Sequence, residues 1–139
     1  MAGRTILIVD DDAALVEVLR RRLEANGYQV VAAADGAEGL ERAKAAAPDL
    51  IISDVIMPTM NGYAFVKALR AIPSLARTPV IILTGKEKMQ DLFYFEGVEL
   101  LDYIVKPFEA PEMVQKVAQL LARVQRHLGE GPGDGLRGA

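Results

Sequence analysis

The sequence predicts an α/β fold in which a doubly wound, parallel sheet of five strands carries helices on both faces. Two observations support this prediction. Five short apolar runs that resemble buried strands alternate with segments in which apolar residues recur at helical spacing. Acidic, hydroxyl or lysine side chains stand where most of these runs stop, at the edge where such sheets bind ligands. The expected strand order is 2-1-3-4-5, with right-handed crossovers.

The expected strands are short runs rich in isoleucine, leucine and valine. The third run is the clearest, and it ends at Asp54 because Pro58 and Asn61 in the next stretch favour a turn over a continued strand. Buried parallel strands are apolar on both faces, which matches these runs. The five runs cover residues 5–9, 28–33, 50–54, 80–83 and 102–105.

A helical pattern follows each expected strand. The last, 109–128, is the most regular, with Pro111 suited to its first turn and apolar residues that form one continuous stripe. Residues 1–128 therefore form one predicted domain. Residues 129–139 contain five glycines and one large apolar residue, so we expect a flexible tail or the start of a linker.

Composition excludes several classes of protein. A chain of 139 residues is one ordinary domain, and without cysteine it has neither disulfides nor thiolate chemistry. Its only histidine, His127, has no second strong nitrogen ligand, which excludes a zinc site. A net charge of -3, with lysine and arginine spread along the chain, argues against direct contact with nucleic acid. No apolar run could span a bilayer and no signal-peptide pattern is present, so we expect a cytoplasmic location.

Polar side chains at four strand ends are predicted to face one crevice. Asp10 and Asp11 follow the first strand, Asp54 ends the third, and Thr84 and Lys106 end the fourth and fifth. Three carboxylates this close repel one another unless a cation lies among them or one takes up a proton. Since only oxygen ligands are available, Mg²⁺ is the natural ion.

These residues are equipped for phosphoryl transfer. Asp54 beside Mg²⁺ could attack phosphorus and become an acyl phosphate, with Lys106 stabilising the transferred group and Thr84 donating a hydrogen bond to it. Each residue alone has a simpler explanation, such as an acidic helix start or a surface lysine. Their joint position at strand ends favours a site.

The motifs that contain these residues resemble, in order and spacing, those of the receiver domain of two-component response regulators. They are Ile-Leu-Ile-Val-Asp10-Asp11-Asp12, Asp54-Val-Ile-Met-Pro58 with Gly62, Leu83-Thr84-Gly85 and Tyr103-Ile-Val-Lys106-Pro107-Phe108. The resemblance covers residues 5 to about 125 and implies a flavodoxin-like fold. It also implies that a histidine kinase or phosphotransfer protein phosphorylates Asp54. By the same likeness Asp10, Asp11, Asp54 and the backbone carbonyl of Ile56 hold Mg²⁺.

The resemblance further implies how the domain would signal. Thr84 and Tyr103 would be the switch pair, and Lys106 would contact the phosphoryl group and precede a cis proline. The surface of the fourth helix, fifth strand and fifth helix would then control a downstream protein or form a homodimer. Such a domain is not an enzyme with a turnover substrate; it catalyses only its own phosphorylation and slow dephosphorylation. Ile56 and Lys86 flank the path of the attacking water in the family, and both favour slow hydrolysis here.

Two departures from the family pattern concern the segment before the fifth strand. Glu99-Leu100 replaces the usual Gly-Ala pair, so we expect the fourth helix to end early or irregularly. Three aromatic residues, 93–95, lie in that segment, and the predicted helical face of Met89, Leu92 and Phe93 leaves Tyr94 or Phe95 pointing outward. An outward aromatic could cover a helix end or contact a partner.

Three alternative functions remain to be compared. Phosphatases with an aspartate nucleophile place a second aspartate two residues later, where this chain has Ile56. A flavin-binding module of similar fold would need a phosphate-binding loop rich in serine, threonine and glycine after the first strand, and none is present. A degenerate receiver, which binds partners without phosphorylation, is disfavoured by the full set of acidic, hydroxyl and lysine residues.

Overall fold

The computed structural model describes residues 3–55, 60–85, 92 and 95–130, and the side chains of these residues up to Val124. Five parallel strands form one sheet in the order β2-β1-β3-β4-β5, which confirms the predicted topology. The strands are β1 (Thr5–Val9), β2 (Gln29–Ala33), β3 (Leu50–Asp54), β4 (Val80–Gly85) and β5 (Leu101–Lys106). The helices are α1 (Ala13–Ala25), α2 (Gly36–Ala46), α3 (Gly62–Ala71) and α4 (Ala110–Glu130), with a short 3₁₀ helix, η1 (Pro73–Leu75).

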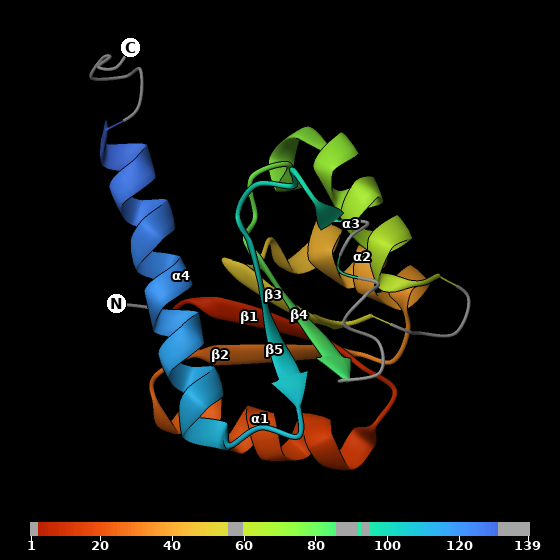
Figure 1. Ribbon diagram of the computed structural model, residues 1–139, viewed down its shortest axis with the longest axis vertical. Coiled ribbons are helices and arrows are strands. Elements are labelled where there is room, and N and C mark those ends of the chain that lie inside the picture. Colours follow the sequence, from red (N-terminus) through yellow and green to blue (C-terminus); the bar gives the residue numbers. More distant parts are fainter. Residues whose placement is uncertain (1–2, 56–59, 86–91, 93–94, 131–139) are drawn as a thin grey trace.

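Helices cover both faces of the sheet, as Figure 1 shows, with α1 and α4 on one face and α2 and α3 on the other. Side chains alternate between the two faces along each strand, so each face has its own apolar core. Ile6, Ile8 and Ile52 face α1 and α4, whereas Leu7 and Ile51 face α2 and α3. All five side chains are fully buried. The central strands are therefore apolar on both faces, as their sequence predicted.

The loops at the carboxyl edge of the sheet lead into capped helices. The side chains of Asp12, Asp35 and Asn61 each accept a hydrogen bond from the backbone N–H three residues later, at 2.8–3.1 Å. Such caps satisfy backbone donors that the first helical turn leaves unpaired. They fix the starts of α1, α2 and α3 at the edge where β1, β2 and β3 end.

One expected element boundary differs from the structure, and one expected element lies mostly outside the described residues. The last helix continues to Glu130, two residues beyond the expected end of the domain at residue 128. The fourth helix, expected between β4 and β5, falls largely on residues 86–91 and 93–94, which lie outside the described part of the chain. The nearby residues 97–100 form an irregular turn, with Leu100 at a φ of 58°.

The expectation that Phe95 could point outward is wrong. Phe95 is 5% exposed and belongs to the core under α2 and α3, where its ring meets the ring of Tyr63 edge-on at 5.7 Å. Leu92 is also packed against this core. Helical periodicity in the sequence alone therefore did not assign the face of Phe95 correctly. Tyr94, the other candidate for an outward aromatic, lies outside the described residues.

No helix among the described residues is long and apolar enough to cross a membrane.

Candidate functional site

The carboxyl ends of four strands bring the predicted site residues together. Strand pairing places Asp54 beside Leu83 and Thr84 beside Val105, one residue before the pair formed by Gly85 and Lys106. Asp10 follows β1, and its backbone N–H donates a hydrogen bond to the carbonyl of Ala33 at 3.1 Å. The four strand ends therefore meet at one edge, as the topology requires. The arrowheads of β4 and β5 mark this edge in Figure 1.

Three carboxylates form a compact acidic cluster. Asp10, Asp11 and Asp54 each offer an oxygen, and these oxygens all lie within 4.8 Å of one another. Asp10 is buried, Asp54 is partly buried and Asp11 is exposed. The cluster is therefore open to solvent on one side and enclosed on the other, so a small ion could enter and keep some of its waters.

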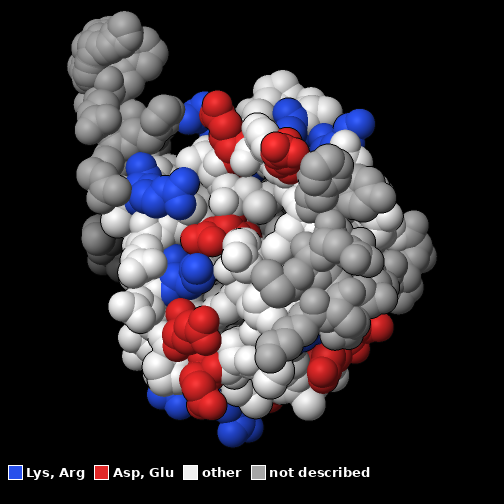
Figure 2. Space-filling model, viewed as in Figure 1, with Lys and Arg blue, Asp and Glu red and all other residues white. Residues whose placement is uncertain are grey.

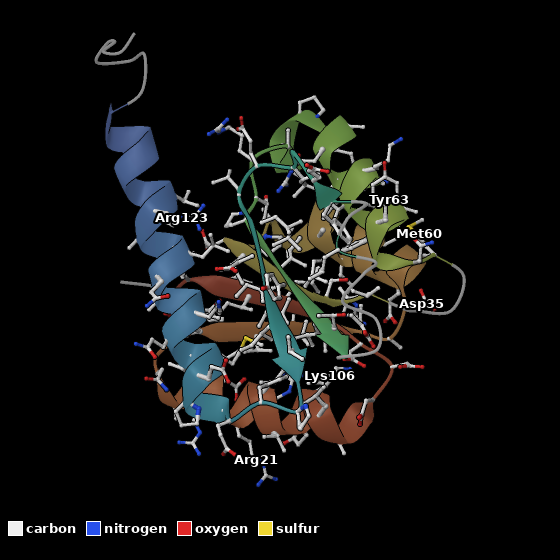
Figure 3. All side chains as sticks on the ribbon, in the orientation of Figure 1. Arg21, Asp35, Met60, Tyr63, Lys106 and Arg123 are labelled. Atoms are coloured by element: carbon white, nitrogen blue, oxygen red, sulfur yellow. The ribbon has the colours of Figure 1, made fainter. Side chains whose placement is uncertain are left out.

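Lys106 joins two members of the acidic cluster. Its Nζ lies 3.4 Å from Oδ2 of Asp10 and 3.4 Å from Oδ2 of Asp54. Figure 3 shows Lys106 at the end of β5, on the same edge as the ends of the neighbouring strands. A cis peptide bond precedes Pro107, as predicted. One ammonium cannot balance three carboxylates, so the cluster keeps a net negative charge.

The pKa values of both Asp10 and Lys106 are raised in the cluster, for different reasons. Burial raises the pKa of the Asp10 carboxyl, and the nearby charge of Asp54 adds to this rise. The backbone N–H of Asp12, which donates to Oδ1 of Asp10 at 2.9 Å, and the ammonium of Lys106 oppose it without cancelling it. Burial disfavours the ammonium of Lys106, but the charges and hydrogen bonds of Asp10 and Asp54 outweigh burial and raise its pKa. Lys106 is therefore firmly cationic at neutral pH.

Thr84 and Gly62 shape the surroundings of Asp54. Thr84 is almost fully buried, and its hydroxyl donates to the carbonyl of Gly85 at 3.2 Å. Gly62 packs directly on the end of β3, so that a Cβ added there would meet the carbonyl oxygen of Asp54 at 2.8 Å. Its N–H donates to the carbonyl of Val55 at 2.7 Å. Only glycine allows the start of α3 to approach the strand this closely, which explains the Gly62 of the sequence motif.

Tyr103 lies on the surface and is 40% exposed. The ammonium of Lys116 on α4 stands over its ring, 6.0 Å from the ring centre. Lys116 also pairs with Asp102 at 3.4 Å. Sequence reasoning did not single out Lys116, since one lysine on the polar side of a helix gives no signal of this contact. Its spacing from Tyr103 becomes meaningful only once β5 and α4 are known to be neighbours.

The structure brings together five of the predicted site residues: Asp10, Asp11, Asp54, Thr84 and Lys106. Ile56, expected to offer its carbonyl to the metal, and Lys86, expected beside the path of water, lie outside the described residues. The carboxylate of Asp54, a fixed ammonium and a hydroxyl thus meet at one edge of the sheet beside the further carboxylates Asp10 and Asp11. This arrangement can bind a divalent cation and stabilise a phosphoryl group as it is transferred.

Comparison with known proteins gives one consistent result. Residues 6–118 match the family described as the response regulator receiver domain. The transcriptional regulatory protein PrrA of Mycobacterium tuberculosis is 38% identical over 118 residues, which cover 85% of this chain and 50% of PrrA. The chain spans about half the length of the curated relatives it matches.

Solved structures agree with the sequence comparison. The chemotaxis response regulator CheY4 of Vibrio cholerae superposes with a TM-score of 0.79 at 34% identity, covering 85% of this chain and 98% of CheY4. The receiver domain of the sensor histidine kinase PA1611 from Pseudomonas aeruginosa PAO1 gives a TM-score of 0.78 at 29% identity, covering 87% and 99%. That structure is described as having a magnesium ion coordinated in the active site cleft.

Proposed function

Because this chain belongs to the response regulator receiver domain family, we propose that it is a signalling switch in which Asp54 accepts a phosphoryl group from a histidine kinase or phosphotransfer protein. Its family is one of signalling proteins of two-component systems. We further propose that the domain has no turnover substrate and catalyses only its own phosphorylation and slow dephosphorylation.

One observation supports Asp54 as the acceptor more than any other. Asp54 is the member of the acidic cluster that is partly buried, contacts Lys106 and remains reachable from solvent, with 17% of its side chain exposed. The side chain of Asp10 is fully enclosed, and among the described residues Lys106 pairs with Asp10 and Asp54 but not with Asp11. A nucleophile must reach an incoming phosphorus atom while a fixed cation stands beside it, and Asp54 meets both needs.

The residues of the chain divide the chemistry among them. A carboxylate oxygen of Asp54 attacks phosphorus, the new oxygen–phosphorus bond forms, and the donor leaves with the electron pair of the bond that breaks. The ammonium of Lys106, held at the carboxylates before the reaction, stabilises the negative charge on the transferred oxygens. The hydroxyl of Thr84 can turn from the Gly85 carbonyl toward the phosphoryl group, since a hydroxyl rotates freely.

The acidic cluster fits a magnesium ion. Asp10, Asp11 and Asp54 supply only oxygen ligands, lie close together and carry more negative charge than Lys106 balances. Hard cations of this kind take a few carboxylates and keep several waters for phosphate oxygens. When bound, Mg²⁺ would neutralise charge between the carboxylates and the incoming phosphoryl group. The carbonyl of Ile56 completes the proposed set of ligands.

The proposed output follows from Tyr103. Its ring is exposed in the present state, so it can move inward when Thr84 shifts toward the phosphoryl group. Such a movement would change the surface formed by the segment before β5, by β5 itself and by α4, which would then control a protein partner or a homodimer. PrrA is named as a transcriptional regulator and is about twice as long as the matched region. We propose that residues 1–128 make no direct contact with nucleic acid. We also propose that the protein is located in the cytoplasm.

Intact-mass measurement tests the acceptor. The 139-residue chain is incubated with phosphoramidate and Mg²⁺, and the same is done with Asp54→Asn and with the control Asp12→Asn. Asp12 is a helix cap beside the cluster, and asparagine caps equally well. We expect a phosphate adduct on the wild type and on Asp12→Asn but none on Asp54→Asn. An adduct that survives in Asp54→Asn would contradict the proposal.

A further inference from the structure

A cavity lies at the opposite edge of the sheet from the acidic cluster. It has a volume of about 570 Å³ and is bounded by α3, by residues 76–77 and by the turn at residues 97–100. Figure 1 shows the end of α3 and the start of β5 together at the top of the view, whereas the arrowheads of β4 and β5 point to the other end. The cavity is therefore separate from the phosphorylation site.

Three cationic side chains line this cavity. They are Lys67 and Arg70 of α3 and Arg77 of the following loop, and Glu99 is the one acidic residue among the described residues of the lining. The cavity is thus positively charged, whereas the whole chain has a net charge of -3. Figure 2 shows blue side chains gathered at the top of the molecule, over the end of α3, with red ones beside them. The local charge balance of the cavity is thus the reverse of that of the whole chain.

Arg70 is held in place and still has donors to spare. Its Nη1 donates to the carbonyl of Thr78 at 2.7 Å, and its Nη2 donates to the carbonyl of Glu99 at 2.9 Å. A guanidinium has five N–H donors, so these two bonds leave others for a ligand. The side chain is also prevented from swinging away, which reduces the entropy lost on binding.

The described residues of the lining do not balance the positive charges of the cavity, because three cations face one carboxylate. Burial lowers the pKa of Arg70, the charge of Arg77 lowers it further, and Glu99 only partly opposes this. Among the described residues no hydrogen bond or ion pair engages Arg77. Two guanidinium groups that repel each other beside a cavity are stabilised when an anion enters it.

The rest of the lining is apolar or aromatic. Val66, Val98 and Leu100 supply aliphatic surface, and Tyr63 stands at the edge with the ammonium of Lys67 5.6 Å from its ring centre. Figure 3 shows Tyr63 on α3, on the other side of the molecule from Arg123 of α4. A concave, largely apolar cavity of this size with a few convergent polar groups is typical of sites for small molecules.

We propose that this cavity binds a small anionic molecule that carries a phosphate or carboxylate group on an apolar body. The arginines pair with the anionic group, since guanidinium is suited to planar, bidentate recognition of both groups. The aliphatic residues and Tyr63 contact the apolar body. The site is independent of phosphorylation at Asp54 and would add a second, chemical input to the domain.

Titration of the ¹⁵N-labelled 139-residue chain with phenylphosphonate, followed by NMR, tests this proposal. Phenylphosphonate joins an anion to a ring, and its phosphorus–carbon bond cannot donate a phosphoryl group. We expect saturable shifts at the amides of Lys67–Arg77 and Gly97–Leu100, with no Mg²⁺ present. Neutral benzenesulfonamide, which has a similar shape, and methylphosphonate, which lacks the ring, should bind more weakly. Equal binding of the neutral compound, or no saturable shift in these residues, would overturn the proposal.

Substitutions separate the charge of the cavity from its structure. Arg77→Gln removes an exposed cation that holds no element in place, and we expect it to weaken phenylphosphonate binding roughly tenfold, or about 1.4 kcal/mol. Arg123→Gln removes an exposed arginine on α4 and should leave the affinity unchanged. Unchanged affinity in Arg77→Gln, with an unaltered thermal unfolding curve, would contradict the assignment.

Titration with an acetylated Glu-Phe-Glu amide distinguishes a small-molecule ligand from a protein partner. If this peptide binds more tightly than phenylphosphonate, the cavity serves a protein partner and the small-molecule proposal is wrong.

Discussion

At the scale of single residues, the carboxylates of the acidic cluster repel one another, and a bound cation would reduce this repulsion. Asp10 is enclosed next to the charge of Asp54, and the ammonium of Lys106 offsets only part of the negative charge. An arrangement of this kind weakens the folded state and strengthens binding of a cation, because the same charges serve both. The same charges should therefore lower the stability of the folded protein and raise its affinity for a cation, and each effect can be measured.

The first prediction concerns metal affinity. Asp11→Ala should weaken Mg²⁺ binding by at least roughly tenfold, because it deletes an oxygen ligand and part of the charge that holds a hard cation. Asp12→Asn is the matched control, since it removes a neighbouring charge that lies outside the cluster and keeps the helix cap. Calorimetric titration of both variants measures the effect. Equal affinity of Asp11→Ala and wild type would remove Asp11 from the ligand set.

The second prediction concerns stability and pH. The pKa of Asp10 is higher in the folded protein than its ordinary value, so the folded state binds this proton more tightly and loses stability as pH rises through that range. Asp10→Asn should therefore raise the melting temperature at pH 7 without Mg²⁺, by a few degrees for about 1 kcal/mol. The gain should shrink as the pH falls below the ordinary aspartate pKa of about 3.9, because the wild-type carboxyl is then protonated in both states.

Asp35→Asn provides the control for the pH experiment, because it removes a capping carboxylate outside the cluster and leaves an equivalent cap. Its melting temperature should change little at either pH. If Asp10→Asn lowers stability at pH 7, the ion pair with Lys106 outweighs the cost of enclosing Asp10, and the account of a strained cluster is wrong.

At the scale of elements, strands were predictable and the connection before β5 was not. The strands are apolar on both faces, so their composition alone identifies them, and their ends locate Asp10, Asp54, Thr84 and Lys106. The turn at residues 97–100 depends instead on the guanidinium of Arg70, which binds the Glu99 carbonyl across 29 residues of sequence. No local pattern encodes a contact of that kind, and the burial of Phe95 was missed for the same reason.

The third prediction tests how this connection is anchored. Phe95→Ala should lower the free energy of unfolding by about 3 kcal/mol, as expected for a large aromatic side chain removed from a core. Tyr63→Ala removes the partner ring, which is 36% exposed, and should cost markedly less. Urea denaturation of the two variants compares them. A smaller loss in Phe95→Ala than in Tyr63→Ala would show that Phe95 does not anchor the segment.

At the scale of the whole molecule, the parallel sheet separates the acidic cluster at one edge from the cavity at the other. The topology brings four strand ends to one edge, and for this reason the acidic cluster could be predicted from sequence before any side-chain position was known. The cavity at the other edge could not, because Lys67, Arg70 and Arg77 look like ordinary surface charges along the chain. Their convergence depends on how α3 and the start of β5 pack together.

The central claim is that Asp54 forms an acyl phosphate, and chemical trapping tests it most directly. Borohydride reduces an aspartyl phosphate to homoserine, which records the phosphorylated position permanently. The chain is treated with phosphoramidate and Mg²⁺, reduced, digested and sequenced by tandem mass spectrometry. We predict homoserine at position 54 and at no other aspartate. Homoserine at position 10, 11 or 12, or its absence from a protein that carries a phosphate adduct, would contradict the account.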